Sequence, residues 1–367
     1  MDDGIELAAA RLGAHLTDLF IAAGAEADAA AAVAGALIEA EAQGAASHGV
    51  LQAPTYLRRL RAGTITGRAS LTLVHASGAV SVFDAGLALG HAVARQAMHQ
   101  AVASARIHGL GAAAVRTATH FGVAGRHARV AADAGLIGIA MCNSRPMLPA
   151  PGGTRAVVGN NPLAIAVPAA GRPPIVFDMA MSAVAMGKIR LAAKRGEAIP
   201  EGWALDQAGR PTTDAAEGLR GVLLPAAGAK GFGLALMVDF LCALAGGSAG
   251  AEVASLYGDP AAPSDSSWLL LAIDPAHFGL AEPYADRVAA LAAAVLADDG
   301  TSLPGDRKRA AEQRFGGTVR LPLSLVRDLD AIAAELGGPA PLLGQDGPSG
   351  PPDGTERASR CQVVPRR

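Results

Sequence analysis

The sequence predicts an α+β fold, in which a mixed-sheet core is joined by a helical domain formed from both ends of the chain. Three observations support this class. Helical patterns come first and last along the chain, strand patterns are confined to the middle, and the middle lacks a regular strand–helix alternation. The 367 residues, 51% of them hydrophobic, suffice for a large core. We expect a helical domain from residues 1–70 plus 284–338, a mixed α/β domain over 71–283 and a disordered tail over 339–367.

The first third of the chain predicts two helices and a hairpin. Small and apolar residues over 27–43 favour a helix that Gly44 can end. A second helix is expected from Leu51 to Ala62, because proline is tolerated in a first turn. Residues 71–83 change to a period of two around a small-residue turn, which indicates a β-hairpin.

The rest of the chain predicts short apolar strands between helices. Strands are expected over 111–116, 136–141, 163–167, 174–177 and 268–273. Helices are expected over 90–107, 123–134, 182–195, 284–297, 304–314 and 324–336, and a buried helix over 232–245. Segments 151–161 and 199–214 are rich in turn residues, so we expect loops there.

The composition argues against several classes of protein. Charged residues make up 17% and aromatic residues 4%, with a formal net charge of −2, so a nucleic-acid binder is not expected. The most apolar long stretch, 231–247, contains Asp239 and is shorter than the ~20 residues of a membrane span. An acidic N-terminus and three cysteines without metal or redox spacing, at 142, 242 and 361, predict a cytoplasmic protein.

Two glycine-rich segments are candidate phosphate sites. Gly109-Leu-Gly111-Ala-Ala-Ala114 has the spacing of a dinucleotide fingerprint, but a helix precedes it and a strand follows. The phosphate needs the reverse order, so we interpret the segment as a helix-to-strand turn. Gly228-Ala-Lys230-Gly231-Phe-Gly233 begins a helix, and it either holds a phosphate or only permits tight packing.

Two of the nine histidines lie in positions suited to chemistry. His48 follows Ser47 in a loop between helices, and His120 lies where a strand meets a helix. Imidazole exchanges a proton near neutral pH, so either could serve an alcohol–carbonyl interconversion. A lone loop histidine is more often an ordinary surface residue. A metal site from His120, His127 and Asp133 is not expected, because the chain lacks HExxH and a close carboxylate cluster.

A series of motifs resembles the malate/L-lactate dehydrogenase family, a non-Rossmann group with ureidoglycolate, sulfolactate, diketogulonate and piperideine-carboxylate enzymes. The resemblance covers about residues 1–335 without large gaps. Its motifs, in order, are Ser47-His48-Gly49, Pro54 with Tyr56, His120-Phe121-Gly122 with Gly125, Pro151-Gly152-Gly153, Asn161-Pro162, Asp178-Met179-Ala180, Gly187-Lys188, Ile199-Pro200-Glu201-Gly202-Trp203-Ala204, Pro211-Thr212-Thr213-Asp214, Leu224-Pro225, Lys230-Gly231 and Leu303-Pro304-Gly305-Asp306.

The resemblance implies an NAD(P)-dependent oxidoreductase that acts on 2-hydroxy or 2-oxo acids. It implies a cofactor-binding core without a Rossmann unit, here residues 71–283, and a homodimer with a small-molecule substrate. The chemistry is a reversible hydride transfer between C4 of the nicotinamide and the hydroxyl-bearing carbon of a substrate of malate, lactate, sulfolactate or ureidoglycolate type. The choice between NAD and NADP stays open.

The resemblance also assigns site residues by position. His48 resembles the proton donor and acceptor of several members, with Ser47 beside it. His120 resembles the acid–base residue of ureidoglycolate dehydrogenase, and we favour His48 for that role here. Substrate contacts are expected from Gln52, Tyr56, Asn160 and Lys188. Cofactor contacts are expected from His120, Phe121, Gly122, Ser144, Asp178, Met179, Ala180, Lys230, Gly305, Asp306 and Arg307.

Three positions depart from the family pattern. Gln52 replaces an arginine that can grip a substrate carboxylate, so bidentate ionic recognition is lost there. Asn160 replaces a threonine, and Lys188 replaces the aspartate of piperideine-carboxylate reductases, which argues against that activity. Segments near Lys188 resemble sulfolactate dehydrogenases and others resemble ureidoglycolate dehydrogenase, so the substrate stays open. The alternative is a catalytically impaired nucleotide-binding member, because of Gln52.

Overall fold

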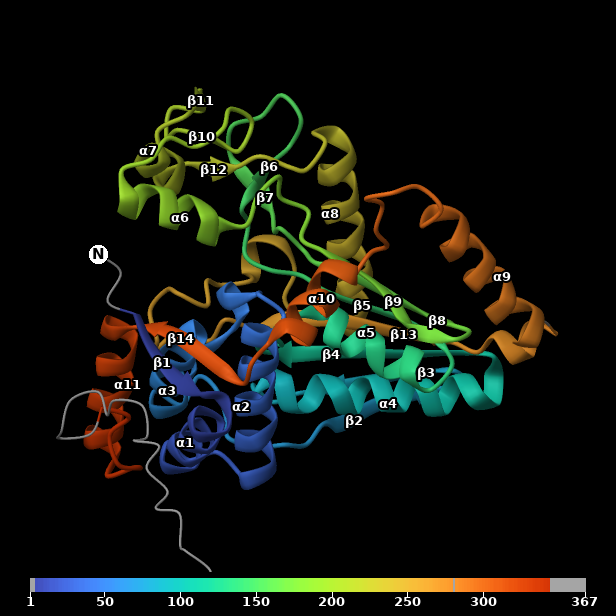
Figure 1. Ribbon diagram of the computed structural model, residues 1–367, viewed down its shortest axis with the longest axis horizontal. Helices are drawn as coiled ribbons and strands as arrows, with labels where there is room; N and C mark the ends of the chain where they lie inside the picture. Colours follow the sequence, from blue (N-terminus) through green and yellow to red (C-terminus); the bar gives the residue numbers. More distant parts are fainter. Residues whose placement is uncertain (1–3, 280, 344–367) are drawn as a thin grey trace, which may run out of the picture.

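A seven-stranded mixed sheet forms the centre of the molecule, which a computed structural model describes over residues 4–279 and 281–343 (Figure 1). The strand order is β2-β3-β4-β13-β5-β8-β9, and only the β3–β4 pair is parallel. The strands are β2 (Thr72–Ser77), β3 (Val80–Asp84), β4 (Leu110–Ala118), β5 (Ile137–Cys142), β8 (Leu163–Ala169), β9 (Arg172–Met179) and β13 (Ser266–Ile273). The sheet and its helices confirm the predicted α+β class, and these strands fall where the sequence predicts them.

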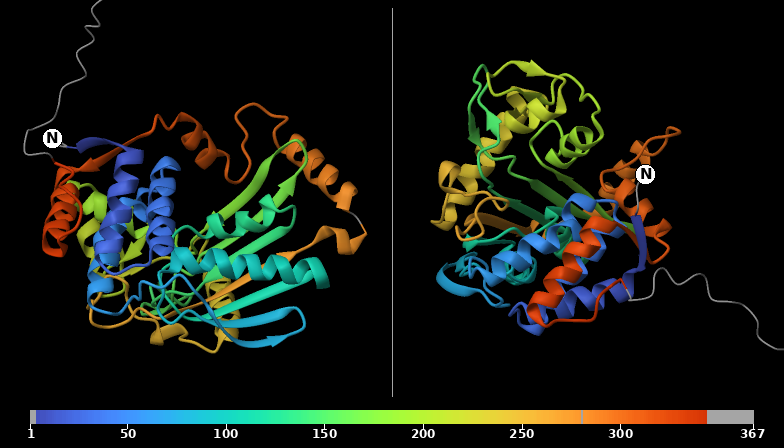
Figure 2. Two further views of the ribbon diagram at one scale, coloured as in Figure 1. Left: turned by 90° about the horizontal axis from the view of Figure 1, so that it is seen from below. Right: turned by 90° about the vertical axis from the view of Figure 1, so that its left-hand side faces the viewer.

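Helices α4 (Gly90–His108) and α5 (Ala124–Asp133) cover one face of the sheet (Figure 2). Alternate strand residues such as Ala113 and Val115 face these helices, whereas Ala114 faces the opposite side. The approach is close: a Cβ on Gly111 would lie 2.0 Å from the carbonyl oxygen of Ala101 in α4. Of the two glycines with dinucleotide-fingerprint spacing, Gly109 therefore ends α4 and Gly111 allows the close packing of α4 on the sheet. This agrees with the predicted helix-to-strand turn.

The opposite face carries α8 (Ala229–Cys242) and a small lobe. The lobe and its neighbours contain α6 (Met186–Arg195), α7 (Ala215–Arg220), β6 (Leu148–Pro149), β7 (Ala156–Val158), β10 (Ala204–Leu205), β11 (Pro211–Thr212), β12 (Val222–Leu223), η3 (Ala243–Ala245) and η4 (Gly250–Glu252). The predicted loops over 151–161 and 199–214 thus contain short strands. Helix α6 begins four residues later than predicted, because Ser182 first bridges to Pro225.

Helix α8 corrects one expectation. Its apolar sequence predicts a buried helix, yet only one side packs on the sheet, through Ala235, Val238 and Cys242. A ridge of large apolar side chains faces solvent instead: Leu234, Met237, Phe240, Leu241 and Leu244, which are 41–65% exposed. An apolar side chain can lie on the surface as well as in the core, so residue type alone does not show which face of α8 packs on the sheet. The sequence therefore predicts more burial for this helix than the structure has.

Both chain ends build one helical core, seen beside the sheet in Figure 2. Strand β1 (Gly4–Ala8) pairs with β14 (Thr318–Pro322), for example through Ile5 and Leu321. The helical elements here are α1 (Ala9–Ala22), α2 (Ala27–Ala42), η1 (Ala46–His48), η2 (Val50–Gln52), α3 (Ala53–Arg61) and α11 (Leu323–Leu336). The sequence did not predict β1, α1 or β14, and α3 starts at Ala53 because residues 50–52 form a 3-10 turn.

Three features bear on the predicted domain division, which stays a prediction. Helix α9 (Ala281–Val295), after η5 (Pro275–Phe278), lies against β8 of the sheet. Helix α10 (Asp306–Arg314) follows Pro304, whose carbonyl accepts from the Val176 N–H of β9. Of the predicted tail, residues 344–367 lie outside the described residues, whereas Leu342 is buried and its carbonyl accepts from Arg11. In the described chain, no helix combines the length and hydropathy of a membrane span.

Candidate functional site

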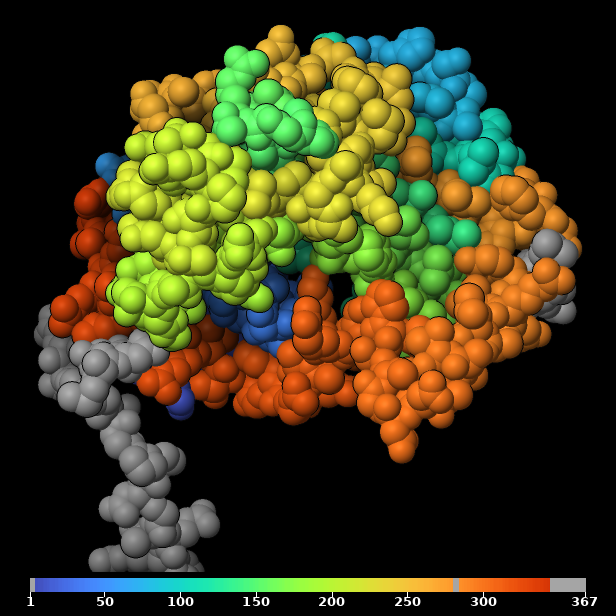
Figure 3. Space-filling view, turned by 90° about the horizontal axis from the view of Figure 1, so that it is seen from above, coloured from blue at the N-terminus to red at the C-terminus, as the bar shows by residue number. Residues whose placement is uncertain are grey.

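A hollow opens between the small lobe, α8 and the α10 segment, and the blue N-terminal part of the chain forms its floor (Figure 3). Five segments that are distant in sequence bring together the side chains described below: η1, α3, the start of α4, the residues after β4, and the end of β9. The meeting of helical and sheet elements places the predicted His48 and His120 side by side, as the ring contacts below show.

Two predicted histidines and a predicted tyrosine form one aromatic stack. The rings of His48 and His120 are stacked, with centroids 5.6 Å apart and 24° between their planes. The Tyr56 hydroxyl lies 2.6 Å from Nδ1 of His120. Ser47 Oγ lies 3.0 Å from Nδ1 of His48. Each imidazole therefore has one ring nitrogen held by a hydroxyl and the other left for different contacts.

His91 completes the cluster, although its sequence context suggested only an ordinary helix residue. It is 2% exposed at the start of α4, edge-on to Tyr56 at 5.3 Å and to His120 at 6.1 Å. Neither ring nitrogen of His91 has a hydrogen-bond partner within the described part of the chain. Gly122, at φ +79°, leaves room for this ring, because a Cβ there would lie 2.6 Å from Nε2.

The surroundings keep these imidazoles neutral. Burial, and then the charge of a protonated His48, lowers the pKa of His120 to about 3. Burial likewise lowers the pKa of His48, while the carboxylate of Asp178 raises it and the ammonium of Lys308 lowers it. Asp178 and Lys308 pair with each other at 2.6 Å. The site thus contains a titratable imidazole, His48, whose pKa responds to two charged neighbours of opposite sign.

The loop that carries His48 is held from both sides. Glu41 Oε1 accepts from the Val50 N–H at 2.8 Å, and burial raises the pKa of this carboxyl. On the other side, Gln52 Nε2 donates to the Ser47 carbonyl at 2.6 Å. These contacts fix the 3-10 turns on which the histidine depends for its position.

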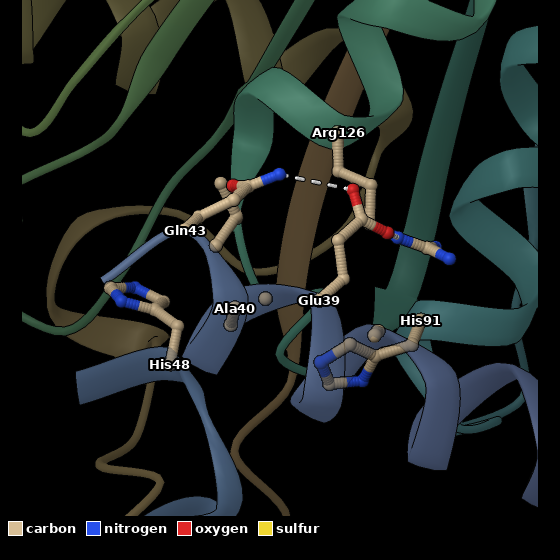
Figure 4. Close-up of a pocket in the computed structure, with 9 residues that line it drawn as sticks. Glu39, Ala40, Gln43, His48, His91 and Arg126 are labelled. Atoms are coloured by element: carbon tan, nitrogen blue, oxygen red, sulfur yellow. Dashed lines mark hydrogen bonds and ion pairs between the residues drawn. The ribbon is translucent and has the colours of Figure 1, made fainter. Parts of the chain in front are cut away.

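A small pocket lies next to the cluster (Figure 4). His48 and His91 line one part of it. Glu39 lines another, where it accepts from Gln43 at 3.2 Å and from Arg126 at 2.7 Å. The Glu39–Arg126 pair connects α2 with α5, so it joins the helical core to the sheet beside the predicted site.

The remaining predicted residues differ in their surroundings. Ser144 Oγ donates to Asn160 Oδ1 at 3.0 Å, and the Met181 N–H donates to the Asn160 carbonyl. Phe121 is buried between the rings of His127 and Trp268. Three of the predicted cations are exposed, namely Lys188, Lys230 and Arg307. Met179 is the last residue of β9 and Ala180 follows it. Gly305 is the N-cap residue of α10.

Asp306 belongs to a structural ion-pair network rather than to an open surface. Its carboxylate pairs with Arg172 at 3.2 Å and with Arg309, and it accepts from the Leu303 N–H at 3.0 Å. His127, part of the disfavoured metal hypothesis, instead stacks on Phe121 and its Nε2 lies 2.8 Å from the Phe121 carbonyl. Residues 4–279 and 281–343 bring no three His, Cys, Asp or Glu side chains together as a metal site.

Sequence reasoning overlooked four side chains near the predicted site. Lys308 follows the predicted stretch 305–307 by one residue. Tyr257 bonds Gln52, and Arg190 lies over the Tyr257 ring at 5.0 Å. His91 had a signal in hindsight, since the adjacent Gly90 begins the longest helix of the described chain next to the His120 segment.

Comparisons with known proteins agree on one family. The family model for malate/L-lactate dehydrogenase matches residues 7–330. The chain is 40% identical over 299 residues to the (2R)-3-sulfolactate dehydrogenase (NADP(+)) of Chromohalobacter salexigens, covering 81% of this chain and 89% of that protein. It is 36% identical over 261 residues to the ureidoglycolate dehydrogenase (NAD(+)) of Escherichia coli O157:H7, covering 71% and 74%.

A solved structure shows the same fold. The sulfolactate dehydrogenase from Methanocaldococcus jannaschii superimposes with a TM-score of 0.86 at 31% identity, covering 91% of this chain and 98% of that chain. The residues that the family model matches include the whole central sheet and both His48 and His120.

Proposed function

This chain belongs to the malate/L-lactate dehydrogenase family, and from that premise we propose that it is an NAD(P)-dependent dehydrogenase that interconverts a 2-hydroxy acid and a 2-oxo acid. The observation that carries the proposal is the pair of stacked, neutral imidazoles His48 and His120 in one hollow. A neutral imidazole accepts a proton from a substrate hydroxyl during oxidation and returns it during reduction.

We assign the proton transfer to His48. With Nδ1–H donating to Ser47 Oγ, Nε2 of His48 has a free lone pair for the substrate hydroxyl. His120 is the weaker candidate, because burial lowers its pKa further, to about 3, so that its protonated form is scarce at neutral pH, and because its Nδ1 is bonded to Tyr56. Its part is to orient the substrate, with its own ring fixed by Tyr56.

The residues of the hollow fit a nicotinamide dinucleotide. Lys230 is exposed and without an ion pair among the described residues, and no side chain caps the start of α8 at Gly228. A cation at an uncapped helix start suits a phosphate. Ser144, Asp178 and Lys308 add hydroxyl, carboxylate and ammonium groups for ribose and amide contacts. The cofactor, when bound, accepts or donates a hydride at C4 of its nicotinamide.

In the oxidation, the substrate C–H bond breaks with its electron pair and the hydroxyl proton passes to His48. The carbon and oxygen form a carbonyl, so one hydride and one proton leave the 2-hydroxy acid. The positive charge that forms on His48 is stabilised by the carboxylate of Asp178, and the neutral ring of His120 adds no repulsion. Reduction reverses each transfer.

We further propose that the protein is a cytoplasmic homodimer. The exposed apolar ridge on α8 and the following η3 turn, which includes Phe240 and Leu244 at 60% and 65% exposure, is the surface we assign to the second copy. The thiols of Cys142 and Cys242 are buried and unpaired, as suits a reducing compartment. Sedimentation of the purified chain tests the dimer, and Phe240→Asp should shift it to the monomer.

The direct test of activity is the absorbance of the reduced nicotinamide with a panel of 2-oxo acids, each with NADH and with NADPH. We expect loss of absorbance with at least one pair. A folded protein that binds the cofactor but turns over no member of the panel would favour the impaired alternative. In that case Gln52→Arg should restore turnover, because it returns a cation to the expected substrate contact.

A further inference from the structure

Gln52 is fully engaged by the protein. Its side chain is 4% exposed, and Nε2 donates both to the Ser47 carbonyl at 2.6 Å and to the Tyr257 hydroxyl at 2.8 Å. The same hydroxyl donates to Oε1 at 3.0 Å. An amide so occupied cannot hold a substrate carboxylate without giving up these bonds. A residue other than Gln52 must therefore supply the cation that binds the acid group of the substrate.

Arg190 reaches the same place from α6. Its guanidinium carbon lies 5.0 Å above the centroid of the Tyr257 ring, whose hydroxyl is bonded to Gln52. An independent contact locates the helix: a Cβ on Gly187 would lie 3.6 Å from Cβ of Ser47. Residues three apart share a helix face, so Arg190 lies on the side of α6 that faces the Ser47–His48 turn.

Arg145 is a second cation near Arg190. It follows the predicted cofactor contact Ser144, and burial and then the positive charge of Arg190 lower its pKa. Its hydrogen bond in the described structure is a long one, 3.4 Å, to the Pro146 carbonyl. Within residues 4–279 and 281–343, neither arginine pairs with a carboxylate.

The charge of Arg190 disfavours the charged form of the half-buried Arg145, so the pair is unfavourable without a counter-charge. Guanidinium groups match carboxylate, sulfonate and phosphate oxygens through paired N–H donors. Tyr257 fixes one of the two by stacking, which reduces the entropy lost on binding an anion. The arrangement is that of an anion site a short way from the proton-transferring His48.

We propose that Arg190 and Arg145 receive the acidic groups of the substrate and determine its specificity, in place of the cation missing at position 52. The inference rests on the proposed dehydrogenase function. A pair of cations is balanced by two negative charges, so the preferred substrate is a 2-hydroxy or 2-oxo acid with a second carboxylate or sulfonate. A monoanionic acid leaves one guanidinium uncompensated.

The test compares oxaloacetate and 3-sulfopyruvate with pyruvate, which lacks the second acidic group, in the full-length enzyme. Arg190→Gln and Arg145→Gln should each raise the KM for the two dianions about tenfold or more, and at least one of them should raise the KM for pyruvate several-fold less, because pyruvate has only one acidic group to lose a partner. Arg190→Lys should recover part of the loss. The matched control is Arg195→Gln, which removes an exposed charge from the end of the same helix and should match the wild type.

The second readout needs no turnover. Malonate, a dianion without a reacting group, should raise the melting temperature of the wild type more than acetate does at equal ionic strength, and Arg190→Gln should abolish the difference. Equal effects of both arginine variants on oxaloacetate and pyruvate, or no malonate shift, would overturn the assignment. So would weaker NADPH binding with unchanged substrate KM, which would assign the arginines to a cofactor phosphate.

The outcomes separate the two proposals. Absence of turnover with every substrate, together with a malonate shift that needs Arg190, would contradict the dehydrogenase function and leave the anion site. Turnover that favours pyruvate, unaffected by either arginine variant, would contradict the anion site and leave the dehydrogenase function.

Discussion

The imidazoles of His48 and His120 are stacked, 5.6 Å between centroids, although one ring comes from a turn of the helical core and the other follows a strand of the sheet. The two rings differ in what holds them: a serine hydroxyl for His48 and a buried tyrosine hydroxyl for His120. We propose that this difference separates a proton-transferring group from an orienting one, and the predictions below test that separation.

Replacing His48 with glutamine should lower kcat by about 10²- to 10⁴-fold, because the group that takes the hydroxyl proton is lost. Steady-state absorbance of the reduced nicotinamide measures it. His99→Gln is the matched control, since His99 is exposed on α4. An unchanged kcat in a folded His48 variant would refute the assigned role.

The pH dependence of kcat/KM for oxidation should move in opposite directions in two variants. Lys308 lowers the pKa of His48 and Asp178 raises it. Lys308→Met should therefore shift the acid limb, where His48 becomes protonated, to higher pH, and Asp178→Asn should shift it to lower pH. Both profiles are taken at saturating cofactor. If both variants shifted the acid limb in the same direction, a group other than His48 would determine its position.

Tyr56→Phe should reduce kcat roughly tenfold, or about 1.4 kcal/mol of barrier, because Nδ1 of His120 loses its hydroxyl partner and the ring its fixed orientation. The same variant should lose about 1–2 kcal/mol of unfolding free energy, since the imidazole nitrogen stays shielded without a bond. Kinetics and urea unfolding measure the two effects. If the variant kept full activity but lost stability, Tyr56 would have only a structural role, and its assigned role in positioning His120 for turnover would be wrong.

Stability should fall as the pH is lowered from 6.5 to 5. Burial lowers the pKa of His127 to about 4 and that of His120 to about 3. Below pH 6.5 these histidines bind protons in the unfolded chain but stay unprotonated in the folded chain. Each of them therefore lowers the free energy of unfolding by about 1 kcal/mol per pH unit. The raised pKa of Glu41 acts in the opposite direction. Urea unfolding at several pH values measures the slope, and a flat profile would contradict the burial of these rings.

The sequence predicted the sheet well because its signals are local. The hairpin at 71–83 and the strand of β13 are period-two or continuous apolar segments bounded by turn residues, which determine strand structure wherever they lie. Strands β1 and β14 were missed for the opposite reason. Each is short, and each depends on a partner from the other end of the chain, as in the pairing of Ile5 with Leu321.

The candidate site was predictable in its members more than in its geometry. The motifs around His48 and His120 predicted both rings as site residues, which stays a prediction, and the structure brings the two rings together. Their stacking needs tertiary packing that no local pattern encodes. Arg190 and Tyr257 were missed because an arginine on an amphipathic helix and a tyrosine in a loop have no distinctive spacing. Their role becomes visible only where three segments meet at Gln52.

Transfer of label tests the central claim most directly. NADH or NADPH carrying deuterium at both hydrogen positions of C4 is incubated with the protein and a 2-oxo acid, and the product is analysed by mass spectrometry. A dehydrogenase predicts a 2-hydroxy acid one mass unit heavier, with the deuterium at C2 and its formation abolished in His48→Gln. Unlabelled product, or no 2-hydroxy acid from any oxo acid in the panel, would contradict the account.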